Sequence, residues 1–257
     1  MIPSLWVVIP HHSRRDLLNL ALRSVQGQRV VVVDDSPGGH VQCPEAEAVL
    51  RTEGEEGFAR ASNAGIAWAQ AAGAEWVLVL NDDAALEEGA LEALSQVALQ
   101  GSGVDAVGPL LRGPEGLESA GLCFSSRTAR VVQRRDVPKE PRDVMALSGA
   151  CLLLRSHWRF SEEFPHAMED IELGLRIREA GKRSVLVPGA VCWHEGGGTR
   201  SRRDPRATRD ALRGHLRLVG DQKSKRVLVL AYAAAQVLKE GPRLQRLGAL
   251  WEGWRLG

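Results

Sequence analysis

The chain has 257 residues, 44 % of them hydrophobic and 25 % charged, which is ordinary for a soluble protein and long enough for one domain with an appendage. Its four cysteines are scattered without a Cys-x-x-Cys pair, so the sequence predicts neither a zinc site nor a disulfide framework. No apolar run approaches the roughly 20 residues that span a bilayer. Because a strand is predicted almost at the N-terminus, we expect no signal peptide.

Three apolar segments, residues 5–9, 30–33 and 76–80, predict strands. Each runs directly into polar residues, which are Pro10-His11-His12, Asp34-Asp35 and Asn81-Asp82-Asp83. Between them, apolar residues at three- and four-residue spacing predict helices over 14–26 and 57–72. This alternation is typical of an α/β fold with a mostly parallel sheet, which binds ligands beyond the carboxyl ends of its strands.

The adjacent acids Asp82 and Asp83 follow a strand that we expect to be buried on both faces. Two carboxylates repel each other there unless a cation or a hydroxyl offsets the repulsion, and a divalent ion holding a phosphate is the usual solution. A solvated turn is the alternative. The second acidic strand end, at Asp34 and Asp35, favours a ligand site.

Residues 168–173 carry a third acidic cluster, in a segment that continues to Ala180. Alternating apolar residues there imitate a strand, but the composition and Gly181 favour a helix. Glu169 and Asp170 then lie in its first turn, where acids either stabilise the helix dipole or serve as a general base. The short strand predicted at 191–194 ends in His194, which is a structural residue or, near a pair of acids, a metal ligand.

Charge is distributed unevenly along the chain. Residues 1–199 hold 19 Lys/Arg against 27 Asp/Glu, a net −8, whereas residues 200–257 hold 14 against 5, a net +9. The basic segment also carries Leu residues, Trp251 and Trp254. We expect helices here that either pack on the core or dock on an anionic membrane surface, and no module for nucleic acid is present.

In this order, seven motifs resemble those of the family 2 glycosyltransferases with the GT-A fold, especially bacterial rhamnosyltransferase-like members. They are Val7-Val8-Ile9-Pro10, Val33-Asp34-Asp35-Ser36, Gly57-Phe58-Ala59 with Asn63, Leu80-Asn81-Asp82-Asp83, Leu147-Ser148-Gly149-Ala150, Glu169-Asp170 with Leu173 and Arg176, and Trp193-His194. The resemblance covers residues 5–200. It implies a GT-A catalytic domain over 1–200, with a Rossmann-like, mostly parallel sheet, and a helical basic extension over 201–257.

The resemblance also implies the role of each site residue. Asp35 would read the nucleobase, beside Asp34 and the backbone of Pro10 and His11; Arg60 and Asn63 would lie near the nucleotide, and Asp82 near the ribose. Asp83 and His194 would hold Mn²⁺ or Mg²⁺ on the donor diphosphate, Asp170 would be the catalytic base, and Ser148, Gly149 and Glu169 would border the sugar and acceptor.

The implied activity is inverting transfer of a sugar from a UDP-, dTDP- or GDP-linked donor to a saccharide or lipid-linked acceptor, in surface polysaccharide or glycolipid synthesis. We therefore expect a cytoplasmic protein. If the basic segment docks on lipid, we expect it to do so at the inner face of the membrane. Glu55 replaces an Asn usual in the family, and residues 159–168 depart from its pattern, so the acceptor is not carried over.

Two other classes compete with this interpretation. A sugar-phosphate nucleotidyltransferase should open with a glycine-rich phosphate loop, but no glycine precedes Gly27. A non-catalytic nucleotide-sugar-binding protein would not need Asp170. A nicotinamide dehydrogenase should carry Gly-x-Gly-x-x-Gly after its first strand, and this sequence has no such motif there.

Overall fold

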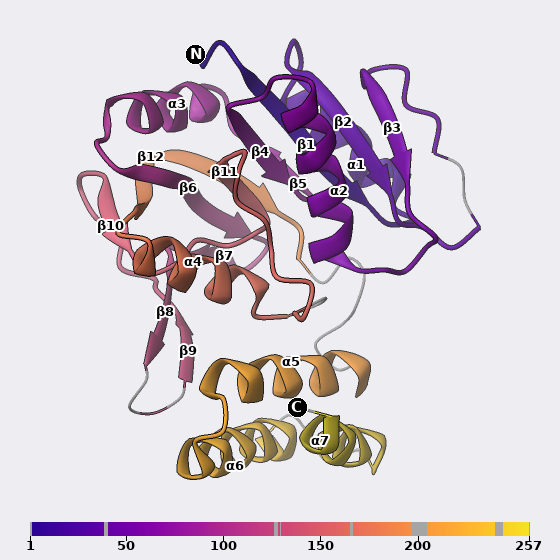
Figure 1. Ribbon diagram of the computed structural model, residues 1–257, viewed down its shortest axis with the longest axis vertical. Coiled ribbons are helices and arrows are strands. Elements are labelled where there is room, and N and C mark those ends of the chain that lie inside the picture. Colours follow the sequence, from indigo (N-terminus) through magenta and orange to yellow (C-terminus); the bar gives the residue numbers. More distant parts are fainter. Residues whose placement is uncertain are drawn as a thin grey trace.

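Figure 1 shows the computed structural model, which describes residues 2–38, 41–125, 128, 130–164, 167–196, 205–239 and 244–256. Its main sheet has the strand order β10-β12-β6-β11-β4-β1-β2-β3, with β5 paired to β12 and β7 paired to β6. The strands are β1 (Leu5–His11), β2 (Arg29–Asp34), β3 (Ala48–Arg51), β4 (Trp76–Leu80), β5 (Ala84–Leu86), β6 (Val104–Gly113), β7 (Gly116–Ser119), β10 (Arg142–Val144), β11 (Cys151–Arg155) and β12 (Arg183–His194). A separate hairpin is formed by β8 (Leu122–Ser125) and β9 (Arg130–Gln133).

The helices are α1 (Arg15–Ser24), α2 (Phe58–Ala71), α3 (Ala90–Gln100), α4 (Glu169–Glu179), α5 (Pro205–Val219), α6 (Lys223–Lys239) and α7 (Leu244–Leu256). The predicted mixed fold with a mostly parallel central sheet is confirmed. The short strand predicted at 191–194 is the end of the much longer strand β12.

The three strands predicted to end in polar residues lie side by side and run in the same direction. β1 pairs in parallel with both β2 and β4, and His11 stands opposite Asp34 in the register. Their carboxyl ends therefore meet at one edge of the sheet, as the sequence predicted. In contrast, β11 runs antiparallel between β4 and β6 and brings Cys151 opposite Leu80.

Alternate residues of each central strand enter two different cores. Val7 and Ile9 pack with the apolar residues of α1 and α3, whereas Trp6 and Val8 pack with those of α2 and α4. Helix α2 approaches the sheet so closely that a Cβ atom at Gly65 would lie 2.4 Å from Val8 Cγ1. Both faces of the sheet are thus covered, which explains its continuous apolar strands.

Helices α5, α6 and α7 bury a third apolar cluster, which contains Leu212, Leu216, Val229 and Leu250. Figure 1 shows this group on one side of the sheet domain, beneath the β8–β9 hairpin. No helix in the described part of the chain is long and apolar enough to cross a bilayer. The predicted domain boundary at residue 200 lies outside the described residues and stays a prediction.

Candidate functional site

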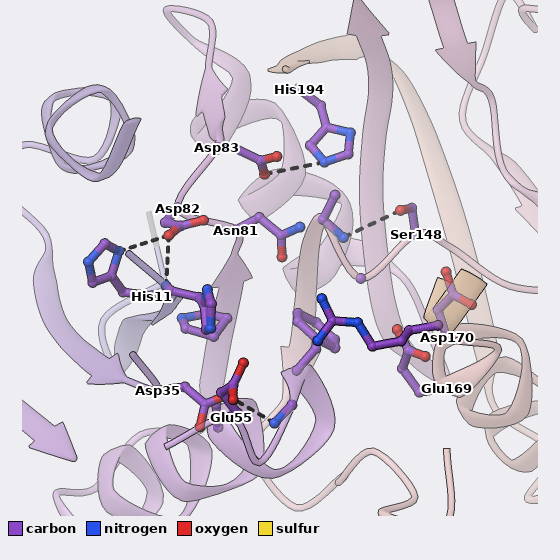
Figure 2. Close-up of a pocket in the computed structure, with 18 residues that line it drawn as sticks. His11, Asp35, Glu55, Asn81, Asp82, Asp83, Ser148, Glu169, Asp170 and His194 are labelled. Atoms are coloured by element: carbon purple, nitrogen blue, oxygen red, sulfur yellow. Dashed lines mark hydrogen bonds and ion pairs between the residues drawn. The ribbon is translucent and has the colours of Figure 1, made fainter. Parts of the chain in front are cut away.

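A cavity of about 460 Å³ opens beyond the carboxyl ends of β1, β2 and β4. Figure 2 shows its side chains converging from the sheet edge, the loop before α2, the loop before β11 and the start of α4. The described residues that line it are Pro10, His11, His12, Asp35, Glu55, Gly57, Phe58, Ala61, Asn81, Asp82, Asp83, Ser148, Gly149, Ala150, Glu169, Asp170, His194 and Arg206.

Most of the site residues predicted from the sequence line this cavity. They are Pro10, His11, Asp35, Asp82, Asp83, Ser148, Gly149, Glu169, Asp170 and His194. The strand ends, the 148–149 loop and the first turn of α4 therefore meet at one place, although up to 184 residues of sequence separate them.

The other three predicted residues do not line the cavity. The carboxylate of Asp34 accepts bonds from the backbone N–H groups of Ser36 and Val41, so it organises the turn after β2. The amide of Asn63 exchanges two bonds with the backbone of Phe160. Arg60 forms a surface ion pair with Glu162, at 3.3 Å.

Asp82 links two consecutive histidines at the end of β1. Its Oδ2 atom accepts bonds from His11 Nδ1 at 2.8 Å and from the backbone N–H of His12 at 2.9 Å. Because a carboxylate only accepts, this contact fixes the tautomer of His11 with a proton on Nδ1. The β1 and β4 ends are thereby held together beside the cavity (Figure 2).

Asp83 and His194 lie next to each other on one side of the site (Figure 2). His194 Nε2 lies 3.3 Å from Asp83 Oδ1, and His194 Nδ1 lies 2.8 Å from Glu118 Oε2 on β7. Burial lowers the pKa of His194, but these two carboxylates outweigh it and raise that pKa to about 10. Burial likewise opposes ionisation of Asp83, yet His194 holds the pKa of this carboxyl below its usual value.

The donor atoms of this pair fit a divalent metal ion. Asp83 Oδ1 is buried, and its close polar contact among the described residues is His194 Nε2, at 3.3 Å. A carboxylate oxygen suits Mn²⁺ or Mg²⁺, and His194 Nε2 would become a ligand for Mn²⁺ on losing the proton that its raised pKa retains. Mg²⁺ is usually bound by few protein ligands together with substrate phosphates. Within the described part of the chain, no group of three or more His, Cys, Asp or Glu side chains could hold a metal alone. Further ligands would have to come from a substrate or water.

Glu169 and Asp170 begin helix α4, immediately after Met168, whose φ of +71° ends the preceding loop. Burial raises the pKa of Glu169, and the charge of Asp170 raises it further, to about 8. Burial also raises the pKa of Asp170 to about 6, against the bonds from the backbone N–H groups of Ile171 and Gly149. At neutral pH, Asp170 is therefore the charged member of the pair and Glu169 the neutral one.

The loop before α2 is tied to the end of β2 through Asp35. Its two carboxylate oxygens accept bonds from the backbone N–H groups of Glu56 and Gly57, each at 2.9 Å. Glu55, which lines the cavity, has a φ of +54°, a left-handed conformation that is costly for a residue with a side chain. Such strained residues cluster at functional sites because the surrounding contacts hold them in place.

Sequence reasoning assigned no role to two charged residues at this site, Glu118 and Arg206. Glu118 lies on a short strand with no motif, and only its pairing with β6 in the folded sheet brings it to His194. Arg206 is one of the 14 Lys and Arg residues of the basic segment, and nothing in the sequence marks it for the cavity. The positive charge of the segment was visible in the sequence, but its target was not.

Comparison with known proteins agrees with this arrangement. The family model described as "Glycosyltransferase like family 2" matches residues 39–219. The N-acetylglucosaminyl-diphospho-decaprenol L-rhamnosyltransferase of Mycobacterium tuberculosis is 31 % identical to this chain, and the match covers 71 % of this chain and 71 % of that protein.

Solved structures share the fold at low sequence identity. A crystal structure of GalNAc-T7 with UDP, GalNAc and Mn²⁺ superposes with a TM-score of 0.65 and 15 % identity, covering 98 % of this chain. Residues 1–349 of S. aureus TarS, in complex with UDP-GlcNAc, superpose with a TM-score of 0.61 and 15 % identity, covering 97 % of this chain and 80 % of that one. The chain spans only about half of GalNAc-T7, 54 % of its length.

Proposed function

Because the chain belongs to glycosyltransferase family 2, we propose that it moves a sugar, with inversion, from a nucleotide-diphosphate donor to an acceptor hydroxyl. The observation that supports this most strongly is the single cavity that holds both the Asp83–His194 pair and the Asp170 carboxylate. Such a transfer needs a metal ion to stabilise the leaving diphosphate and a base to take the proton of the acceptor. The Asp83–His194 pair would hold the metal ion, and Asp170 would be the base.

The donor is assigned to the ends of β1, β2 and β4. Asp35 and the backbone of Pro10 and His11 would contact the nucleobase, and Asp82 the ribose. Asp83 and His194 would hold Mn²⁺ or Mg²⁺, which when bound neutralises charge that grows on the leaving diphosphate. For Arg60 and Asn63 the structure suggests a supporting role instead, because their contacts fix the loop around Phe160 and Glu162.

Asp170 is assigned the role of general base. The acceptor oxygen attacks the anomeric carbon while the bond from that carbon to the diphosphate oxygen breaks, and the acceptor proton passes to the Asp170 carboxylate. A single displacement of this kind inverts the anomeric centre. The pKa of about 6 favours the role, since Asp170 is ionised at neutral pH but basic enough to accept a proton.

Neutral Glu169 adds a second function on the acceptor side. Its Oε2 atom is buried and has no hydrogen-bond partner among the described residues. A protonated carboxyl can donate a hydrogen bond, so we assign Glu169, with Ser148 and Gly149, to positioning the sugar or the acceptor.

The relative from Mycobacterium tuberculosis guides the choice of substrates. Its name describes transfer of L-rhamnose to a sugar linked through diphosphate to a polyprenol. We propose a substrate pair of the same class for this chain: a nucleotide-linked deoxysugar such as L-rhamnose as donor, and a lipid-linked saccharide as acceptor, within the synthesis of a surface polysaccharide or glycolipid.

Docking of the α5–α7 group on an anionic membrane surface would suit such an acceptor. These helices bury their own apolar cluster, as the packing alternative expects, yet among their described side chains four large apolar ones are exposed: Val227, Leu228, Leu238 and Trp251. Cationic helices that expose Trp and aliphatic residues bind anionic lipid at its surface. We therefore propose a cytoplasmic enzyme that docks peripherally on the inner face of the membrane.

A thermal-shift screen tests the proposed donor. UDP-, dTDP- and GDP-linked sugars are added with Mn²⁺ or with EDTA, and a specific donor should raise the melting temperature only with the metal, because ligand binding stabilises the folded state by mass action. A nucleotidyltransferase would instead turn over a sugar phosphate and a nucleoside triphosphate, and a non-catalytic binder would bind the donor without transfer to any acceptor. Absence of a shift with all of these donors would contradict the proposal.

A further inference from the structure

The cavity is strongly acidic, although its proposed substrate is an anion. Six acidic side chains, of which Glu169 is neutral at pH 7, are among its described lining residues: Asp35, Glu55, Asp82, Asp83, Glu169 and Asp170. Arg206 is the single lysine or arginine among the described lining residues. A diphosphate that enters such a pocket needs cations around it, and one metal ion offsets only part of the negative charge.

Arg206 does not come from the sheet domain. It lies in the first turn of α5, within the basic segment, and its exposed side chain lines the cavity. The first turn of a helix is the positive end of its dipole, which favours acids and disfavours cations. The first turn of α5 contains Arg206 and no acid, so the helix dipole does not explain Arg206.

Contacts further along α5 fix the helix against the site. Gly214 is so close to the residues before α4 that a Cβ atom there would lie 2.7 Å from the Ala167 carbonyl oxygen. Arg217 donates a hydrogen bond to the Glu163 carbonyl oxygen, and Leu218 packs against the cluster around Ile171. Arg206 stands eight residues before Gly214, about 12 Å along the helix axis, so the docked helix holds it at the cavity.

A second hollow adjoins the cavity at Arg206. It has a volume of about 310 Å³, lies between α5 and α7, and is lined by Pro205, Arg206, Arg209, Gln245, Gly248, Ala249 and Glu252. A phosphate at Arg206 thus has the reaction cavity on one side and a path along the basic helices on the other. This geometry suits a substrate in which a sugar is joined through phosphate to a longer group.

We propose that Arg206 is the phosphate-binding residue through which the C-terminal helices take part in substrate recognition, a role that rests on the proposed sugar transfer. The guanidinium binds a diphosphate in a bidentate manner. That diphosphate belongs either to the nucleotide donor or to the lipid-linked acceptor, and the two sources share the same chemistry.

The test compares wild type with Arg206→Ala and Arg206→Lys, and with Lys223→Ala as a control that removes one exposed charge of the same basic segment. Calorimetric titration of UDP, dTDP and GDP with Mn²⁺ reports on the donor. The KM for N-acetylglucosamine linked by diphosphate to a short lipid, against that for its neutral octyl glycoside, reports on the acceptor.

If Arg206 binds the donor, Arg206→Ala weakens nucleotide binding about 10- to 100-fold, the cost of losing a charged hydrogen-bond partner. If Arg206 binds the acceptor, Arg206→Ala raises the KM for the diphosphate-linked acceptor by the same factor. The KM for the neutral octyl glycoside and the nucleotide affinity then stay unchanged. Arg206→Lys should fall between wild type and Arg206→Ala, and Lys223→Ala should match wild type, at unchanged melting temperatures.

The proposal would be overturned if wild type is active and Arg206→Ala keeps two constants within twofold of wild type. These are the dissociation constant of the nucleotide and the KM of the diphosphate-linked acceptor. A lower melting temperature with unchanged constants would also overturn it, because Arg206 would then only hold the helix. A wild type that transfers no sugar would contradict the proposed function instead. In that case inorganic pyrophosphate with Mn²⁺ is the probe, and equal affinity of wild type and Arg206→Ala overturns the role of Arg206.

Discussion

Replacing Asp170 and Glu169 one at a time should have opposite outcomes, although the two carboxyls are neighbours. At pH 7 Asp170, with a pKa of about 6, is mostly charged, whereas Glu169, with a pKa of about 8, is mostly neutral. Asp170→Asn removes the base and should lower kcat by about 10²-fold or more, with donor affinity unchanged within a few-fold. Glu169→Gln copies the neutral side chain and should keep kcat within a few-fold.

The pH dependence of kcat/KM gives a second measure of the same assignment. A base with a pKa of about 6 is about one-tenth ionised at pH 5 and nine-tenths at pH 7, so wild-type kcat/KM should rise about tenfold between these values. Glu169→Gln should keep this rise, and the residual rate of Asp170→Asn should lose it.

Stability should change with pH in the direction set by Glu169. Its pKa is raised from 4.5 in the unfolded chain to about 8, so the stability of the neutral carboxyl is fully present below pH 4.5 and is lost as the pH rises through 8. Glu169→Gln does not titrate. Urea unfolding should therefore show wild type losing up to about 5 kcal/mol relative to this variant across that range.

Two results would refute the reasoning about this pair. Near-normal turnover of Asp170→Asn would place the base elsewhere, with Glu169 the next candidate. An equal loss of activity in both variants, with parallel stability curves between pH 4.5 and 8, would show that the two carboxyls do not divide their roles.

Three further predictions concern the proposed metal ligands Asp83 and His194 and the basic helices. Asp83→Ala should abolish turnover and make nucleotide binding independent of Mn²⁺ without unfolding the protein, whereas calorimetric binding of the donor to wild type that is unchanged in EDTA would contradict a metal role. Glu118→Gln should weaken Mn²⁺ binding about 10- to 100-fold, measured by paramagnetic resonance, because the carboxylate orients His194, and Glu115→Gln in the exposed neighbouring turn should not. In vesicle flotation, the protein should bind anionic lipid at low salt and lose it at high salt, and deletion of residues 241–257 should reduce binding further; absence of flotation at low salt would favour packing alone.

The sheet and one side of the site could be predicted because the relevant signals are local. Valine-rich strands that end in acids fix which residues stand at the carboxyl edge, and parallel pairing of β1 with β2 and β4 brings Asp35, Asp82 and Asp83 together. The first turn of α4 was equally readable, because its composition outweighed the alternating pattern.

The rest depends on contacts that no short segment contains. Glu118 reaches His194 only because β7 folds back on β6, and Arg206 reaches the cavity only because α5 docks beside α4. Asn63 matches a family motif, yet its amide is used to hold the Phe160 loop. A matching residue type in a helix does not reveal which contacts its side chain makes in the folded protein.

The most direct test of the proposed transfer is the stereochemistry of its product. Purified protein, Mn²⁺, a nucleotide-linked L-rhamnose and a diphosphate-linked N-acetylglucosaminyl lipid are combined, and the anomeric configuration of the new bond is read by NMR. We predict a glycosylated product of configuration opposite to that of the donor, formed by wild type and lost in Asp170→Asn. A product that retains the donor configuration, or that forms equally fast with Asp170→Asn, would contradict single displacement at Asp170.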